Sequence, residues 1–501
     1  MNPFGTQMFR GECYFFENAR KQSDRIFGSM KSRLFHELFV IGFNDSGDGK
    51  PPIHIVPPAC SLTTDHFINV SSNAKQLAQN EQVNILNVLM TSQEIENHRI
   101  QMESVRNAID SRMTQLDSQA GNVLSYVSFP VKIGNYTTAV VIRFLKDVFD
   151  GLYKFQKGYG MTSNMQIPKS FLEATIFSLL QSLHETLLVP DPDQINAGAY
   201  DDEIMRRAGR MMMRTPFLSI NTASGMPDLF ETCQLLSALK YEGKDGAGRI
   251  IFATRGHESI ETKVAFTKPR LLQDTRSARK MLEMTSNNLS LLCDTEYVYG
   301  LGNVLSNYNP ASQKVFEVQF LSQAVWEFKH AGNTMMHVTH GIPQLSGYEF
   351  SASGFKATLT QCFPNLGATA LERLCTITAL FTSKKHGCVL AITPQAASET
   401  IRLSNQCIGI EPQILDNSLI SAITEIDGAV LVDHEARCHA VGVILDGPAH
   451  ERCNPGRGSR YNSALRYAYG HKSECVVLVK SDDGMVDSFG MMPINAQLTP
   501  P

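Results

Sequence analysis

The chain has 501 residues, enough for about two to four domains, and its 43% hydrophobic and 19% charged residues are typical of an ordinary globular protein. The formal net charge of −4 gives no overall attraction to nucleic acid, so we expect no nucleic-acid partner. No window approaches the about 18 uncharged apolar residues of a membrane span, the N-terminus lacks the order of a signal peptide, and the 11 cysteines include no CxxC pair. We therefore expect a soluble cytoplasmic protein with reduced cysteines and no membrane partner.

Residues 1–124 combine an irregular start with a long predicted helix. No Gly or Pro occurs between Asn73 and Gln119. Apolar residues recur every seven positions in this stretch: Val88, Ile95, Met102, Ile109 and Leu116. The spacing predicts a long helix, which is either a short coiled coil that self-associates or a helix packed on its own protein. The sequence favours neither interpretation.

Residues 125–353 are predicted to form a mixed α/β domain. The stretch "SFLEATIFSLLQSLHETLL" (170–188) has the amphipathic pattern of a helix. The stretches "RIIFATRG" (249–256) and "EYVYGLG" (296–302) are apolar runs closed by glycine, which is typical of strands followed by turns.

Two further features of this region have a structural and a functional interpretation. The run "MRRAGRMMMR" (205–214) is basic and rich in methionine, but it lacks the interleaved aromatic residues of many nucleic-acid interfaces. We expect its methionines to pack in a core and its arginines to face solvent, rather than to bind a ligand. The single tryptophan, Trp326, is likewise expected in the core.

Residues 354–495 are predicted to form a compact α/β domain. The expected helices are 370–387 and 417–426, and the expected strands are 388–393, 428–433, 440–445 and 475–480. Each strand is apolar at consecutive positions, which indicates a sheet covered by helices on both faces.

The motif "IDGA" (426–429) lies at the start of one of these strands. It places the carboxylate of Asp427 beside the unobstructed backbone of Gly428. Such a carboxylate can hold a divalent cation, and the glycine allows a nucleotide to approach closely. Asp482 and Asp483, which follow the last strand, could supply a second oxygen ligand.

The stretch "PGRGSRYNSALRYA" (455–468) lies between a strand and a helix. Ser459 is a natural N-cap for a helix that starts at Arg460. The free amides and the dipole at that end favour an anion, and Arg457 and Arg460 can add charge-assisted hydrogen bonds to phosphate. The stretch has no Lys-Ser or Lys-Thr pair, so it is not a P-loop.

The order of these motifs resembles the diadenylate cyclase (DAC) domain of the DNA-integrity scanning protein DisA and related bacterial cyclases. The resemblance covers residues from about 360 to 492 and rests on "KKHGCVLAIT", "DGAVLVD", "GSRYNSA" and "VVLVKSDDGMVD". The region upstream, about 125–350, resembles the sensor-like domains found ahead of such domains. The fold implied is a mixed central sheet with helices on both faces, preceded by a mixed α/β sensor-like domain and a long N-terminal helix.

The resemblance implies a reaction in which two ATP molecules condense into cyclic di-AMP and release two pyrophosphates. Because each domain holds one ATP, it also implies a homodimer or higher homo-oligomer with facing DAC domains. The residues implied are Asp427 and Arg460 as catalytic; Gly428, Ala429, Gly458, Ser459, Arg460, Tyr461 and Asn462 as nucleotide-binding; and Asp427, Asp482 and Asp483 as ligands of Mg²⁺ or Mn²⁺.

The sequence departs from the family pattern within the phosphate motif. Where the family carries Arg-His-Arg, this chain has Arg460, Tyr461 and Asn462, and Ile426 replaces the histidine that many members have before the aspartate. The acidic residues after the last strand are aspartate rather than glutamate. Two functions therefore stay open: a cyclase, and a catalytically weak or inactive module that senses nucleotide. A purely structural glycine turn in an interaction protein is a third.

Overall fold

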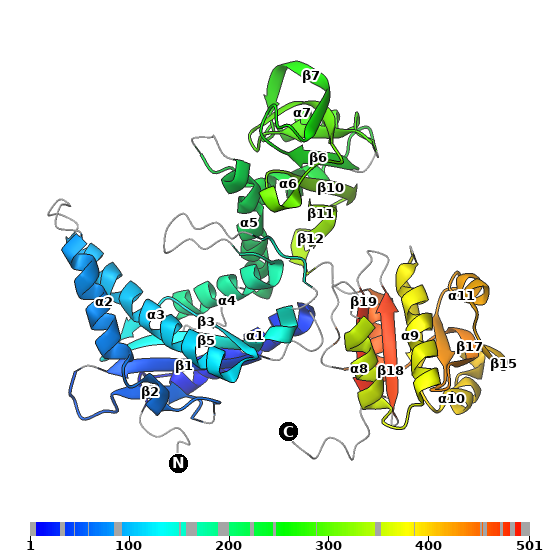
Figure 1. Ribbon diagram of the computed structural model, residues 1–501, viewed down its shortest axis with the longest axis horizontal. Coiled ribbons are helices and arrows are strands. Elements are labelled where there is room, and N and C mark those ends of the chain that lie inside the picture. Colours follow the sequence, from blue (N-terminus) through cyan, green and yellow to red (C-terminus); the bar gives the residue numbers. More distant parts are fainter. Residues whose placement is uncertain are drawn as a thin grey trace. The chain divides into compact units, whose positions relative to one another are not determined.

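The structure is a computed structural model of the chain (Figure 1). It describes residues 7–30, 36–44, 46–58, 60–84, 93–149, 152–156, 168–188, 200–220, 225–243, 247–286, 288–345, 352–384, 386–450, 453, 458–470, 474–480 and 486–491. The chain divides into two compact units: residues 1–26 with 34–346, and residues 27–33 with 347–501. Among the described helices, none is both long and apolar enough to span a bilayer. No disulfide joins the 11 cysteines.

The first sheet of the N-terminal unit is antiparallel and has the order β2-β1-β5-β3, with β4 paired to β5. Its strands are β1 (His36–Asn44), β2 (Ile53–Val56), β3 (Val123–Val127), β4 (Val131–Ile133) and β5 (Tyr136–Leu145). The helices of this region are α1 (Glu12–Met30), α2 (Val70–Asn84), α3 (Gln93–Ala120) and α4 (Phe171–Leu187), with 3₁₀ turns at Thr64–Phe67 and Lys146–Phe149. Helix α4 confirms the helix predicted over 170–188, and Ser170 caps it by accepting from the Glu173 amide.

The long predicted helix differs from the expectation in one respect. The stretch from Asn73 to Gln119 forms two helices, α2 and α3, which pack against each other (Figure 1). Of the heptad residues, Met102, Ile109 and Leu116 on α3 are buried, while Val88 lies outside the described residues. Ile109 and Leu116 share a core with Phe39 of β1. The heptad pattern thus marks a helix packed on its own protein.

The second sheet of this unit has the order β13-β12-β11-β10-β6-β8-β9-β7. Its strands are β6 (Gly248–Phe252), β7 (Ile260–Leu271), β8 (Ser290–Cys293), β9 (Tyr297–Val304), β10 (Phe316–Ser322), β11 (Val325–His330), β12 (Asn333–Thr339) and β13 (Ile342–Gln344); its helices are α5 (Asp201–Ile220), α6 (Leu229–Ala238) and α7 (Thr275–Leu282), with a 3₁₀ turn at Pro310–Ser312. Strands β6 and β9 confirm the two predicted strands, but the glycine turn expected at the end of the second strand is wrong, because Gly300 and Gly302 lie inside β9 and pair with β7 and β8.

Helix α5 contains the basic, methionine-rich run. Met212 and Met213 are buried, whereas Arg207 pairs with Glu185 and Arg210 pairs with Glu203. Trp326 is fully buried and donates to Gln234 at 3.0 Å. The structural interpretation of both features is confirmed, except that these two arginines are engaged in ion pairs rather than merely solvated.

The C-terminal unit has a six-stranded mixed sheet of order β15-β17-β16-β14-β18-β19 (Figure 1, yellow to red). Its strands are β14 (Cys388–Ile392), β15 (Ile408–Ile414), β16 (Ala429–Val432), β17 (Arg437–Val443), β18 (Cys475–Lys480) and β19 (Val486–Met491). Its helices are α8 (Ala352–Cys362), α9 (Ala368–Ser383), α10 (Ala396–Arg402), α11 (Asn417–Ile423) and α12 (Ser459–Gly470), with a 3₁₀ turn at Ser404–Gln406. Only β14 and β16 are parallel among the paired strands.

Each face of this sheet carries its own core, because alternate strand residues point to opposite faces. Leu390 of β14 packs with α8, α9 and α11, whereas Val389 and Ala391 pack with α10 and α12. The prediction of a mixed sheet covered by helices on both faces is confirmed. Helix α12 and the turn before β16 lie at one edge of the second face, and this edge holds the candidate site.

The predicted domain boundaries compare with these units in two ways. The boundary at 353/354 lies close to the division after residue 346. The boundary at 124/125 falls inside β3, because β1 and β2 precede α3 in the chain but share one sheet with β3 and β5. The first 124 residues are therefore not separable from the strands that follow them.

Candidate functional site

The turn before β16 presents Asp427 to solvent. The Asp427 side chain is 89% exposed, and its Oδ1 accepts a hydrogen bond from the Gly428 amide at 3.1 Å. Gly428 has φ +116°, and a Cβ at this position would lie 2.6 Å from the carbonyl carbon of Gly442 on β17. Glycine is required here because two backbones meet at closest approach.

The phosphate-motif stretch leads into α12, which begins at Ser459, one residue earlier than predicted. The difference arises because the Asn462 amide donates to the Gly458 carbonyl at 3.2 Å, so that Gly458 occupies the N-cap position. Gly458 and Ser459 are exposed, and no atom of the described residues lies within 4 Å of a Cβ placed on Gly458. The N-terminal end of α12 therefore presents backbone amides of exposed residues, and anion binding there stays a prediction.

The two residues predicted as catalytic contact each other. Arg460 Nη2 donates to Asp427 Oδ1 at 3.1 Å, and the two side chains are 36% and 89% exposed. Asp427 comes from the turn before β16 and Arg460 from the first turn of α12. The fold therefore brings a carboxylate and a guanidinium, 33 positions apart in the sequence, to one exposed point.

The other predicted nucleotide-binding residues differ in where they lie. Tyr461 is 6% exposed, and its ring packs edge-on against Phe489 with centroids 5.2 Å apart. Ala429 is also buried, in the same core. Asn462 Nδ2 donates to the Gly458 carbonyl at 3.3 Å, so this side chain closes the first turn of α12. Gly428, Gly458, Ser459 and Arg460 remain accessible at the surface or as backbone.

Of the predicted metal ligands, the structure describes Asp427 alone. Asp482, Asp483 and Arg457 lie outside the described residues. Within the described part of the chain, no three His, Cys, Asp or Glu side chains cluster as a metal site. Mg²⁺ is commonly held by one or two carboxylates together with substrate phosphates, and Asp427 offers one exposed carboxylate, which here accepts from Arg460, so the metal site stays a prediction.

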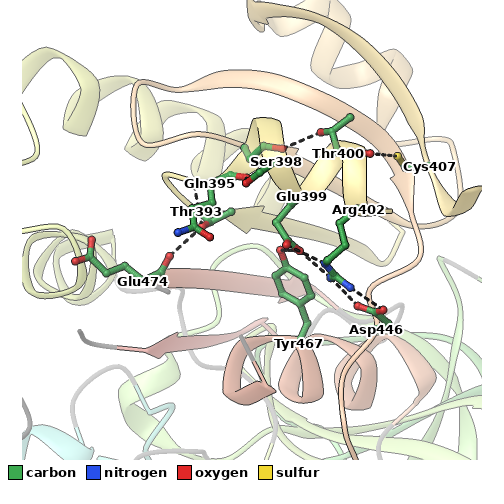
Figure 2. Close-up of polar contacts among 11 residues, drawn as sticks. Thr393, Gln395, Ser398, Glu399, Thr400, Arg402, Cys407, Asp446, Tyr467 and Glu474 are labelled. Carbon is green, nitrogen blue, oxygen red and sulfur yellow. Dashed lines mark hydrogen bonds and ion pairs between the residues drawn. The ribbon is translucent and has the colours of Figure 1, made fainter. Parts of the chain in front are cut away.

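A second polar cluster, not predicted from the sequence, lies between α10 and α12 (Figure 2). Arg402 donates to both oxygens of Glu399 at 2.9 and 2.7 Å and to both oxygens of Asp446 at 2.9 and 2.7 Å. The Tyr467 hydroxyl donates to Glu399 Oε2 at 3.0 Å. We call these four residues the Arg402 cluster. The Glu399-x-x-Arg402 spacing on a helix is the single sequence signal that could have revealed part of it.

Side-chain pKa values in the Arg402 cluster follow from its contacts. The hydrogen bonds from Arg402 to Glu399 and then to Asp446 raise the pKa of the guanidinium. Burial, and then the charge of Glu399, raise the pKa of the Tyr467 hydroxyl. Both groups therefore remain protonated donors at neutral pH. Beside the cluster is a hollow of about 650 Å³, lined by Gln395, Glu399, Arg402, Asp446, Gly447, Pro448, Tyr467 and Gly470.

Comparison with known proteins gives this site its class. Residues 378–490 match the family described as DisA bacterial checkpoint controller nucleotide-binding. The matched stretch of this chain includes β14, β16, α12 and the Asp427–Arg460 pair. This part of the chain is therefore a DAC domain, a nucleotide-binding domain of the DisA family. Residues 8–213 and 227–332 match the families described as "Probable sensor domain DACNG" and "Probable sensor domain DACNH". The chain is a DAC-domain protein with sensor domains upstream, as its sequence predicts.

Solved structures similar to this chain include two from bacteria. A double mutant of DacA from Staphylococcus aureus is 11% identical, with a TM-score of 0.21 over 24% of this chain and 80% of that one. A hypothetical membrane spanning protein from Bacillus cereus is 20% identical, with a TM-score of 0.18 over 24% of this chain and 63% of that one. A search of the curated proteins finds no match.

Proposed function

We propose that this protein is a diadenylate cyclase, which condenses two ATP molecules into cyclic di-AMP and releases two pyrophosphates. The observation that carries the proposal is the contact between Asp427 and Arg460, at 3.1 Å, within a DAC domain. Each 3′-hydroxyl attacks the α-phosphate of the other ATP, the bond to pyrophosphate breaks, and the hydroxyl proton passes to solvent or a base. Because one domain holds one ATP, the reaction requires two DAC domains that face each other in a homo-oligomer.

The chain's own residues have separate tasks in this reaction. The amides at the start of α12 and the Ser459 hydroxyl bind the triphosphate, and Arg460 stabilises the charge that develops on the leaving pyrophosphate. Gly428 lets the nucleotide approach the backbone beside Asp427. Asp427 orients the attacking hydroxyl and, with Asp482 or Asp483, would hold Mg²⁺ or Mn²⁺. The cation supplies Lewis-acid stabilisation of phosphate charge.

Arg460 is shared between two partners in this scheme. In the structure the Arg460 guanidinium contacts Asp427, whereas the reaction needs it on phosphate. An exposed ion pair contributes at most about 1 kcal/mol, so a triphosphate can displace it at small cost. The sensor domains upstream would regulate the reaction, in a soluble cytoplasmic protein.

The test is to incubate the full chain with ATP and either Mg²⁺ or Mn²⁺ and to look for cyclic di-AMP by mass spectrometry. We expect product from the wild type and a loss of at least about 100-fold in Arg460→Ala and Asp427→Asn, as for other groups that stabilise transition-state charge. Glu372→Gln, on the exposed face of α9, is the matched control and should match the wild type. No product with either metal contradicts the proposal.

The second candidate is a module that binds nucleotide with little or no turnover. Its support is the position of Tyr461, which replaces the histidine of the family motif and packs in the core against Phe489. Only Arg460 of that motif is then a cation at the phosphate, and the loss of one charge-assisted contact weakens transition-state binding. Calorimetry with ATP and cyclic di-AMP separates the candidates: binding without product favours the sensor, and no binding contradicts both.

A further inference from the structure

The Arg402 cluster joins two segments, of which one carries Arg460 and the other follows the strand that lies beside the turn of Asp427. One segment is residues 444–450, which follows β17 and starts where Gly442 contacts Gly428, next to Asp427. The other is α12, which carries Arg460 in its first turn. Arg402 holds the first segment through Asp446, and Glu399 holds α12 through Tyr467 (Figure 2).

These contacts form a closed circuit. The circuit runs from Asp427 and Gly428 to Gly442 and then along the chain to Asp446. Asp446 accepts from Arg402, which donates to Glu399, and Glu399 accepts from Tyr467 on α12. Helix α12 also carries Arg460, which donates to Asp427 and closes the circuit. The Glu399 and Tyr467 contacts of this circuit are buried, so they would continue to restrain α12 when a triphosphate displaces the exposed contact between Asp427 and Arg460. The connection also packs tightly on α12, since a Cβ on Gly447 would collide with the Arg466 carbonyl and one on Gly470 would lie 2.5 Å from Pro448 Cδ.

The chemistry of the cluster suits a brace. Glu399 is 7% exposed, and its two oxygens accept from the Arg402 fork and from the Tyr467 hydroxyl. A planar guanidinium bonded at both ends to carboxylates has one geometry, unlike a lysine ammonium. Helix α10, which supplies Glu399 and Arg402, packs on β16 and β17. The Arg402 cluster is therefore supported by β16, the strand that follows the turn of Asp427, and by its neighbour β17.

We propose that Glu399, Arg402, Asp446 and Tyr467 are positioning residues that set the alignment of Asp427 and Arg460 for phosphoryl chemistry. The inference rests on the proposed function. It predicts that removal of the Tyr467 hydroxyl or the Asp446 charge changes the alignment of the reacting groups and leaves the binding surface for the triphosphate in place. The rate falls because misplacement of a catalytic group by a fraction of an ångström lowers the effective molarity.

The first experiment measures kcat and KM for cyclic di-AMP formation by the full chain. Tyr467→Phe and Asp446→Asn are expected to lower kcat about tenfold, which corresponds to about 1.4 kcal/mol, with a smaller increase in KM of up to about fivefold, because Arg460 also contributes to ATP binding. Asp446→Glu, which keeps the charge, should recover part of kcat, and Glu372→Gln should match the wild type. Unchanged kcat in both cluster variants, or a loss of unfolding free energy with unchanged kcat per folded molecule, overturns the proposal.

The second experiment keeps the inference testable without turnover. ATP affinity is measured by calorimetry for the wild type, Tyr467→Phe, Arg460→Ala and the double variant. If the cluster positions Arg460, the effects are coupled, and Tyr467→Phe changes affinity at least about threefold less once Arg460 is absent. Additive effects overturn the positioning role. If the wild type binds ATP but forms no product, the cyclase proposal is wrong, and the comparison of these four affinities still decides whether the cluster positions Arg460. If the wild type does not bind ATP, both the cyclase proposal and the positioning role are wrong.

Discussion

Gly428 shows how a single residue serves both backbone packing and the candidate site. Its φ of +116° and the 2.6 Å approach of Gly442 leave no room for a side chain. Gly428→Ala is therefore expected to lower the free energy of unfolding by about 2 to 4 kcal/mol, because backbone strain and overpacking add. Urea denaturation measures the change. Gly458→Ala is the matched control, since no atom of the described residues lies within 4 Å of a Cβ at Gly458, and it should cost less than about 1 kcal/mol. Equal effects of the two substitutions would contradict this reading of Gly428.

At the scale of one element, α3 decides between the two interpretations of the heptad pattern. Ile109 is fully buried among Phe39, Met113 and Val141. Ile109→Ala is expected to lower the free energy of unfolding by about 2 to 4 kcal/mol, because a cavity replaces the side chain. Sedimentation should detect no change in oligomeric state where the variant remains folded. A changed oligomeric state with unchanged stability would restore the coiled-coil interpretation.

Helix α4 carries a pH-sensitive residue. His184 Nδ1 donates to the Phe129 carbonyl at 2.9 Å, and burial lowers the pKa of the imidazole below the usual 6.5. The unfolded chain therefore binds a proton more readily, so stability is full above about pH 6.5 and falls as the pH drops below it. Urea unfolding at pH 7.5 and pH 5.5 should show a smaller loss in His184→Gln than in the wild type. Identical losses would show that His184 does not contribute to the pH dependence.

For the whole molecule, the division into two compact units predicts two separable unfolding transitions. Leu390 is fully buried in the core between the C-terminal sheet and α8, α9 and α11. Leu390→Ala should lower the free energy of unfolding of the C-terminal unit by about 2 to 5 kcal/mol, so that one calorimetric transition moves to a lower temperature and the other is unchanged. A bound nucleotide stabilises the unit that binds it, so ATP should raise the midpoint temperature of the same transition whose midpoint Leu390→Ala lowers. A shift of both transitions by the substitution would contradict separate units.

The sequence was most informative where residues are apolar on both faces of a strand. Strands β14, β16 and β18 were predicted close to their observed bounds for that reason. Strand β15 was missed because it is an edge strand whose residues are almost all exposed, so it lacks that pattern. The boundary at 124/125 failed to follow the fold because a sheet can join strands that lie on either side of long helices.

By itself, the sequence determined the α/β class, the buried strands, and Asp427 and Arg460 as functional candidates, because burial patterns, glycine turns and helix starts are local properties. Tertiary structure decided which groups meet. It joined Asp427 to Arg460, moved Tyr461 into the core against Phe489, and linked Arg402 to Asp446 across 44 positions. These contacts depend on strand order and helix docking, which bring distant residues together through the packing of both faces of one sheet.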